Sequence, residues 1–150
     1  MELSLPGTDD AILRAARHVV ELAGELGFPE ERRNEIQTAV VEALTNAAIH
    51  GNENHATPVR LTAEIDGDSL RVEIVDAGSG LSEIPPLPDL ERKLEGLDPP
   101  QGWGIYLMRS FASEIDYALD PERGHIVKLK FDEESPGALV EPRIERNAHA

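Results

Sequence analysis

The sequence predicts an α+β fold: a two-layer sandwich whose mixed, mostly antiparallel β-sheet is covered on one face by about three helices. Segments with the apolar spacing of helices stand beside segments that alternate every second residue, and short turns join the alternating segments in pairs. The length of 150 residues fits one domain, and a hydrophobic content of 40% is sufficient for its core.

Two helices are predicted in the N-terminal third of the chain. Thr8 or Asp9 caps the first helix, whose apolar residues recur at helical spacing until Gly27 ends it. The second helix is expected over residues 29–50, with Gly51 as its terminator. Its apolar stripe consists of Ile36, Ala39, Val40, Ala43, Leu44 and Ala47.

Two β-hairpins are predicted in the rest of the chain. Residues 59–65 and 70–75 alternate with a period of two, and Asp66-Gly67-Asp68 between them is typical of a hairpin turn. Residues 115–119 and 126–131 form a second alternating pair around a turn that contains Asp, Pro and Gly.

A third helix is expected between the hairpins. It begins at Gly102-Trp103-Gly104, after a proline-rich stretch from about residue 83 to 100, and ends near Phe111. Residues 1–131 are therefore expected to form the domain, and the polar residues 132–150 a flexible C-terminal tail.

The composition excludes several classes of function. Fourteen Lys and Arg against 29 Asp and Glu give a net charge of −15, which would repel a phosphate backbone, so direct nucleic-acid binding is not expected. Without cysteine there is no disulfide, thiolate zinc site or cysteine nucleophile. No apolar run reaches the length of a membrane span and the N-terminus lacks a signal-peptide pattern, so we expect a cytoplasmic protein without membrane contact.

The first candidate site is the pair Glu42 and Asn46, which are spaced i, i+4 on the second predicted helix and therefore project from the same side. An amide oxygen can bind Mg²⁺ while a neighbouring carboxylate positions or deprotonates a hydroxyl. The alternative for such a pair is an ordinary solvated helix face.

Two glycine-containing segments are further candidates. Asp76 stands at the end of a strand and is followed by Gly78 and Gly80, which either permit close approach of a ligand to the backbone or form an ordinary turn. The segment Gly102-Trp103-Gly104 leads directly into a helix, where free backbone N–H groups can bind an anion.

Taken in order, these segments resemble the N-box and the two glycine boxes of the Bergerat (GHKL) ATPases, which have histidine-kinase-like ATPase domains. The N-box has the form EALTNAAIHGN, beginning at Glu42, and the glycine boxes are Asp76-Ala77-Gly78-Ser79-Gly80 and Gly102-Trp103-Gly104. The short chain is most similar to the stand-alone anti-sigma factor serine/threonine kinases. Detached sensor histidine kinase domains share the boxes, but their partner is a histidine-bearing dimerisation helix that this chain lacks.

The resemblance implies a role for each polar residue. Glu42 would be the catalytic general base that orients a hydroxyl, and Asn46 would bind both the nucleotide and its magnesium ion. Asp76 would accept a hydrogen bond from the adenine amino group. The implied cofactors are ATP or ADP and Mg²⁺, whose binding would supply the positioning and charge neutralisation that phosphoryl transfer requires.

The glycine boxes would complete the nucleotide site. Gly78 and Gly80 would allow the chain to pass close to the nucleotide, and residues from about 79 to 101 would form a lid over it. Gly102-Trp103-Gly104 would donate backbone N–H groups to the phosphates.

The function implied by the resemblance is that of an anti-sigma factor with ATP-dependent protein kinase activity. It would bind a sigma factor of RNA polymerase, phosphorylate a STAS-domain anti-anti-sigma factor on a hydroxyl, and form a homodimer. The alternatives are a non-enzymatic regulator whose protein binding is gated by ATP, and a scaffold that has lost its ligand.

Some residues depart from the family pattern or allow two interpretations. Family members commonly carry a threonine where this chain has Gly124-His125-Ile126-Val127, so a hydroxyl contact is expected to be missing. Trp103 is bulkier than usual, and the lid is rich in proline. Arg109 is expected to meet either a phosphate or a surface acid, and His50 to cap its helix rather than bind a metal.

Overall fold

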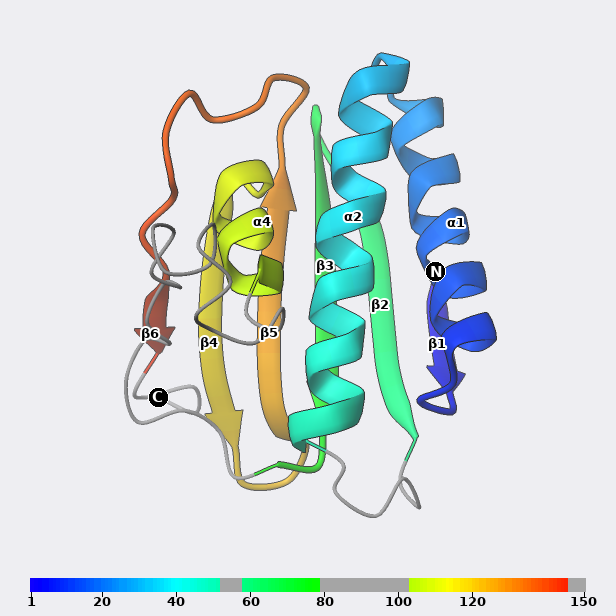
Figure 1. Ribbon diagram of the computed structural model, residues 1–150, viewed down its shortest axis with the longest axis vertical. Coiled ribbons are helices and arrows are strands. Elements are labelled where there is room, and N and C mark those ends of the chain that lie inside the picture. Colours follow the sequence, from blue (N-terminus) through cyan, green and yellow to red (C-terminus); the bar gives the residue numbers. More distant parts are fainter. Residues whose placement is uncertain (52–57, 79–102, 146–150) are drawn as a thin grey trace, which may run out of the picture.

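The computed structural model describes residues 1–51, 58–78 and 103–145. These residues form one six-stranded sheet in the order β1-β2-β3-β5-β4-β6. The helices lie together on one face of this sheet (Figure 1). Strands β1 to β5 pair antiparallel, while β6 runs parallel to β4. The two-layer α+β sandwich predicted from the sequence is therefore confirmed.

Helix α1 (Asp9–Glu25) begins and ends at signals that the sequence contains. The Thr8 side chain accepts a hydrogen bond from the Ala11 N–H at 3.4 Å. Gly27, with φ of 80°, ends the helix because this backbone conformation strains residues that carry a Cβ. Among the described helices, none combines the length and the apolar character needed to cross a membrane.

Helix α2 (Glu30–Asn46) ends four residues earlier than the sequence predicts. Residues Ala47–Gly51 continue it as a π-helical turn, η1, which lies against strand β3. Single π-helical turns are wider than α-helical ones and are frequent at functional sites. The residue spacing predicts a helix here but does not distinguish the two helical forms.

Both predicted hairpins are present. The strands are β1 (Glu2–Leu5), β2 (Val59–Asp66), β3 (Ser69–Asp76), β4 (Glu114–Asp120), β5 (Gly124–Phe131) and β6 (Arg143–Glu145). Strands β2 and β3 form the first hairpin and β4 and β5 the second, and β3 pairs with β5. These pairings place the end of β3 beside the start of β5, far from each other in sequence.

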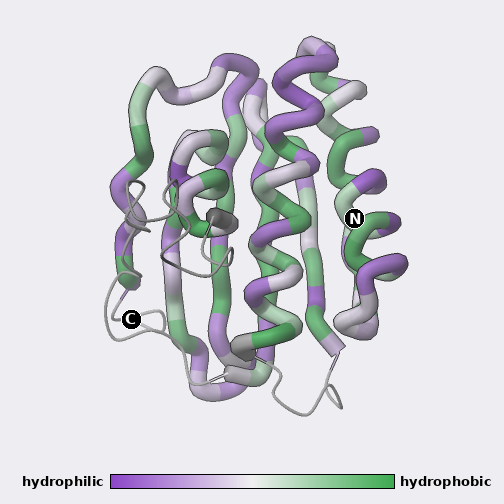
Figure 2. The backbone as a smooth tube through the Cα atoms, in the orientation of Figure 1, coloured by the Kyte–Doolittle hydropathy of each residue, from purple (hydrophilic) through white to green (hydrophobic). Residues whose placement is uncertain are grey.

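The core lies between the sheet and the helices, and Figure 2 shows hydrophobic segments recurring along both layers. On the helix-facing side, β3 contributes Leu70, Val72 and Ile74, and β5 contributes Val127, Leu129 and Phe131. Successive side chains of a strand point to opposite faces. Asp76 and His125 continue these alternations, so two polar residues extend the helix-facing side at one end of the sheet.

Residues 132–145, for which the composition predicts a flexible tail, run beside the domain and end in β6, which pairs with β4. Arg109, buried on α4 (Trp103–Phe111), donates from Nε to the Val140 carbonyl at 2.9 Å and from Nη2 to Glu141 at 3.0 Å. The Val140 N–H donates back to the Arg109 carbonyl at 2.8 Å. Polar contacts thus connect residues 132–145 to the domain, although their composition alone predicts disorder. Of the two partners expected for Arg109, a phosphate or a surface acid, the structure shows an acid, Glu141.

Candidate functional site

Two segments predicted to carry function meet where α2 packs against α4. Gly104 is buried, and a Cβ at this position would overlap the carboxylate of Glu42. One turn further along each helix, the amide nitrogen of Asn46 lies 3.9 Å from the sulfur of Met108. The absence of a side chain at Gly104 therefore creates the space that the Glu42 carboxylate fills.

The Glu42 carboxyl group is partly buried, which disfavours its ionised form. Burial raises its pKa above the ordinary value of 4.5. Among the described residues, no Lys, Arg or His forms an ion pair with it. It also lines a surface recess of about 350 Å³ together with Asn34, Gln37, Thr38 and Val41 of the same helix. Glu42 thus combines a raised pKa with access from solvent, as expected of a proton acceptor.

Asp76, the last residue of β3, is 4% exposed and its carboxylate is held from two sides. Oδ1 accepts a hydrogen bond from the Gly78 N–H at 2.7 Å, and Oδ2 lies 3.2 Å from Nδ1 of His125. Gly124, with φ of 109°, lies so close that a Cβ there would overlap the Asp76 carbonyl. The structure therefore fixes the orientation of this carboxylate in detail.

His125 is a polar neighbour of Asp76 that the sequence analysis did not identify as such. Its ring stacks on Tyr117 with centroids 6.1 Å apart and an interplanar angle of 16°. Burial raises the pKa of the Tyr117 hydroxyl. The Nε2 atom of His125 is buried and has no hydrogen-bond partner among the described residues. The pairing of β3 with β5, which the sequence pattern does not specify, puts His125 directly opposite Asp76.

The Glu42 and Asp76 groups are connected through the π-helical turn. Turn η1 follows Asn46 directly and lies against β3, the strand that ends at Asp76. Elements that pack against one another therefore carry, or lead directly to, five of the predicted site residues: Glu42, Asn46, Asp76, Gly78 and Gly104.

Other predicted positions cannot be placed in this arrangement. Gly80, Gly102 and the lid over residues 79–101 lie outside the described residues, and so do the side chains of His50 and Trp103. Helix α4 begins at the backbone of Trp103.

The sequence matches the family model of the histidine kinase-like ATPase domain over residues 5–131. It is 36% identical over 123 residues to an anti-sigma F factor of Clostridium acetobutylicum, covering 75% of this chain and 80% of that protein. It is 34% identical over 137 residues to an anti-sigma F factor of Clostridium beijerinckii, covering 83% of this chain and 87% of the relative.

Solved structures show the same fold at low sequence identity. The RsbU and RsbW domains of a Mycobacterium tuberculosis protein match with a TM-score of 0.60 and 19% identity, over 94% of this chain and 33% of that one. The SiaB-SiaC complex of Pseudomonas aeruginosa matches with a TM-score of 0.52 and 10% identity, over 87% of this chain and 88% of that one. The chain therefore belongs to the histidine kinase-like ATPase family, among the relatives of the anti-sigma F factors.

Proposed function

We propose that this protein is an anti-sigma factor of the partner-switching type and an ATP-dependent protein serine/threonine kinase. It would bind a sigma factor in one nucleotide state and phosphorylate a STAS-domain anti-anti-sigma factor in another. The observation that carries the kinase assignment is the placement of the Glu42 carboxylate against Gly104, with Asn46 on the same side of α2. The names of the relatives support the anti-sigma assignment.

In the proposed reaction, Glu42 accepts the proton of a serine or threonine hydroxyl. The hydroxyl oxygen forms a bond to the γ-phosphorus of ATP as the bond from that phosphorus to the bridging oxygen breaks, and ADP leaves. Burial raises the pKa of Glu42, which makes its carboxylate a stronger proton acceptor than an exposed one. The recess along α2, which Glu42 lines, would give a protein substrate access to this carboxylate.

Asp76 would provide the selectivity for adenine. Its carboxylate is buried and oriented by Gly78 and His125, so an amino group on the base can be recognised by a hydrogen bond that water does not replace. A base without that donor would leave a buried carboxylate short of a partner, which costs about 1–3 kcal/mol.

The donor set fits a magnesium ion that is bound together with a triphosphate. Among the described residues, no three acidic, histidine or cysteine side chains are gathered as a metal site. Mg²⁺ commonly binds through one or two protein oxygens, with substrate phosphates and waters completing its shell. Because the amide nitrogen of Asn46 is directed at Met108, its amide oxygen is the ligand atom offered. The ion would neutralise phosphate charge during transfer.

The kinase assignment is tested by incubating the protein with γ-labelled Mg-ATP and a STAS-domain protein from the same organism. We expect phosphoserine or phosphothreonine on the STAS protein. Glu42→Gln should lower the rate by about a hundredfold or more, the size typical of loss of a general base. Glu31→Gln, a change at an exposed position of the same helix, is the matched control and should retain the parent rate.

The outcomes separate the candidate functions. Transfer that is unchanged in Glu42→Gln would contradict the role of Glu42. ATP-dependent binding of a sigma factor without any transfer would support the non-enzymatic regulator. Failure to bind either nucleotide or partner would contradict the proposal as a whole. Light scattering of the same samples tests for the homodimer.

A further inference from the structure

The Nε2 atom of His125 has no role in the site as described so far. Its two ring nitrogens differ, because Nδ1 lies 3.2 Å from Asp76 whereas Nε2 is buried without a partner in the described part of the chain. The side chain is 12% exposed and that of Asp76 is 3% exposed, so water has little access to either. A buried nitrogen left unpaired destabilises the structure, and such atoms call for a specific explanation.

Neighbouring residues hold the ring of His125 in place. Tyr117 stacks against it, and the adjacent Gly124 fits closely under the Asp76 carbonyl. The register of β3 and β5 aligns His125 with Asp76 on the helix-facing side of the sheet. The imidazole is therefore fixed in both position and orientation, and its unpaired nitrogen cannot turn to solvent without breaking these contacts.

We propose that His125 is a specificity-determining residue for the nucleotide base, with a separate role for each ring nitrogen. Nδ1–H donates to Asp76 and orients that carboxylate toward the exocyclic amino group of the base. Nε2 contacts the ring nitrogen beside that amino group, directly or through one water molecule. This inference rests on the proposed nucleotide site at Asp76, and it adds the residue that recognises a second atom of the base.

The chemistry of the two groups fits a 6-aminopurine. Such a base presents a donor, the amino group, next to an acceptor, the ring nitrogen at position 1 or 7. Asp76 accepts from the donor. A protonated His125 donates to the acceptor from Nε2, and a neutral one reaches it through a water that donates to both nitrogens. A purine with a carbonyl group at position 6 would place an acceptor against the Asp76 carboxylate and would bind more weakly.

The chain permits substitutions that separate the two roles. In His125→Asn the amide nitrogen can occupy the position of Nδ1 and donate to Asp76, while nothing replaces Nε2. In His125→Gln the amide reaches the position of Nε2, and the donor to Asp76 is lost. His125→Ala removes both. Tyr117→Phe keeps the stacked ring and is the matched control for packing.

The test measures binding of ATP, 1-deaza-ATP and 7-deaza-ATP to each variant by calorimetry, after thermal unfolding has shown that the variant is folded. For the parent, one deaza analogue should bind about tenfold more weakly than ATP, which identifies the ring nitrogen contacted. His125→Asn should weaken ATP binding by a similar factor and should show no further loss with that analogue. His125→Gln should keep the difference between ATP and the analogue, although it binds both more weakly.

Three results would overturn the inference, and they differ in what they leave standing. If the parent binds ATP but His125→Asn weakens all three nucleotides by the same factor, His125 contributes only to packing and the proposed function survives. If the parent binds no nucleotide, the proposed function and this inference fail together. Loss of binding in Tyr117→Phe equal to that in His125→Asn would show that any change beside the imidazole weakens binding, and would likewise overturn the specific role of His125.

Discussion

Two buried polar side chains near opposite ends of α2, Arg32 and His125, differ in how completely they are hydrogen-bonded. Where α2 begins, Arg32 is 3% exposed and donates to the carbonyl groups of Asp132 at 2.8 Å and Phe111 at 2.7 Å, and to the Ser113 hydroxyl at 3.3 Å. Its guanidinium also lies 5.6 Å from the ring centre of Phe131. Where α2 ends, the Nε2 atom of His125 has no hydrogen-bond partner in the part of the chain that the structure describes. All three guanidinium nitrogens of Arg32 donate hydrogen bonds, whereas His125 pairs through one of its two ring nitrogens among the described residues.

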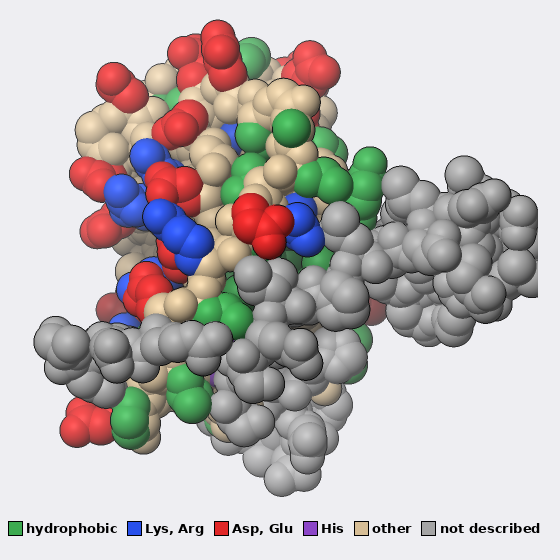
Figure 3. All heavy atoms as spheres, turned by 90° about the vertical axis from the view of Figure 1, so that its left-hand side faces the viewer, with side chains coloured by type: hydrophobic (Ala, Val, Ile, Leu, Met, Phe, Trp, Pro, Cys, Tyr) green, Lys and Arg blue, Asp and Glu red, His purple; other side chains and the backbone are tan. Residues whose placement is uncertain are grey.

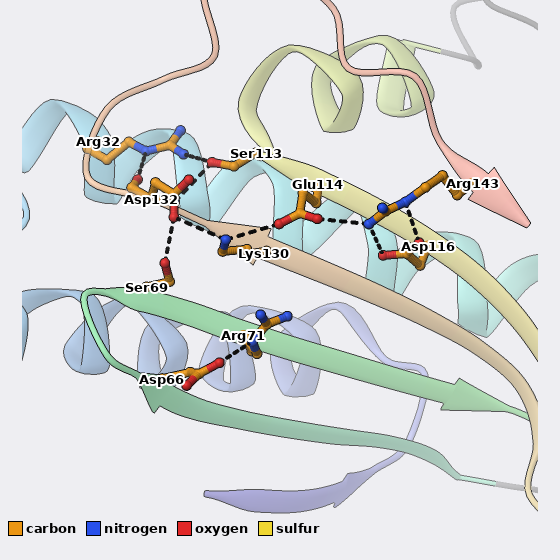
Figure 4. Close-up of polar contacts among 10 residues, drawn as sticks. All are labelled: Arg32, Asp66, Ser69, Arg71, Ser113, Glu114, Asp116, Lys130, Asp132 and Arg143. Atoms are coloured by element: carbon orange, nitrogen blue, oxygen red, sulfur yellow. Dashed lines mark hydrogen bonds and ion pairs between the residues drawn. The ribbon is translucent and has the colours of Figure 1, made fainter. Parts of the chain in front are cut away.

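The pKa values of two carboxyl groups, Glu114 and Glu42, are shifted in opposite directions. Hydrogen bonds and charge from Lys130, and then from Arg143, hold the pKa of the Glu114 carboxyl below its ordinary value. Figure 4 shows these groups in a network that continues to Asp116 and Asp132. Figure 3 shows acidic and basic side chains intermixed on that side of the molecule. Glu42 has no such partner among the residues that the structure describes, and burial raises its pKa.

This difference indicates that some polar groups of the domain serve its stability and others serve binding and catalysis. A polar group with all its partners stabilises the fold, whereas an incompletely paired one in a fixed position has free capacity for a ligand. We therefore expect substitutions at the Arg32 end to change stability, and those at the Asp76 end to change binding and catalysis.

The largest effect on stability is expected from Arg32→Met. The change leaves the carbonyl groups of Phe111 and Asp132 and the Glu35 carboxylate without their buried donor, so the free energy of unfolding should fall by about 3 kcal/mol or more. Urea denaturation measures this change. Arg14→Met, at an exposed position of α1, should be nearly neutral. An equal loss in both variants would contradict the structural role of Arg32.

Gly124→Ala is expected to affect both properties. Alanine is strained at φ of 109°, and its Cβ would overlap the Asp76 carbonyl, so we expect a loss of about 2 kcal/mol in stability together with weaker ATP binding. Gly67→Ala is the matched control, because Gly67 also has positive φ, 64°, but open space around it. If the two variants weaken ATP binding equally, the contact with Asp76 does not matter.

The sequence predicts the fold more completely than the site. Caps, hairpin turns and apolar spacing depend on neighbours in the chain, so the helix end at Gly27 and the turn at Gly67 could be located directly. The Arg32 contacts, the Asp76–His125 pair and the strand at Arg143–Glu145 join residues far apart in sequence. Their positions follow from strand order and register, which a single sequence leaves open.

Gly104→Ala should separate activity from stability. The added Cβ would displace the tip of the Glu42 side chain, which is flexible, while alanine favours the helix, so unfolding free energy should change by less than about 1 kcal/mol. Displacement of the carboxylate should lower phosphoryl transfer about tenfold or more. Gly104→Ala is introduced into the parent and into the Glu42→Ala variant, and stability and kcat/KM are measured in both pairs. In the latter the Gly104 substitution should have no further effect on transfer, because no carboxylate remains to be displaced.

The smallest effect on stability is expected from Glu42→Gln, which tests whether the Glu42 charge destabilises the fold. Its folded pKa is raised, so the folded state disfavours the charged form, and Glu42→Gln should make the protein more stable while it removes transfer. Below pH 4.5 both side chains are neutral and the difference should vanish; as the pH rises through this value the glutamine variant gains the advantage. Since Glu42 is partly exposed, solvent screening keeps the gain below about 1 kcal/mol. Denaturation curves from pH 4 to 8 measure it, with Glu31→Gln as the control. A glutamine variant less stable than the parent at pH 7 would mean that the Glu42 charge stabilises the fold, and the contrast between the two ends of α2 would then fail at its central residue.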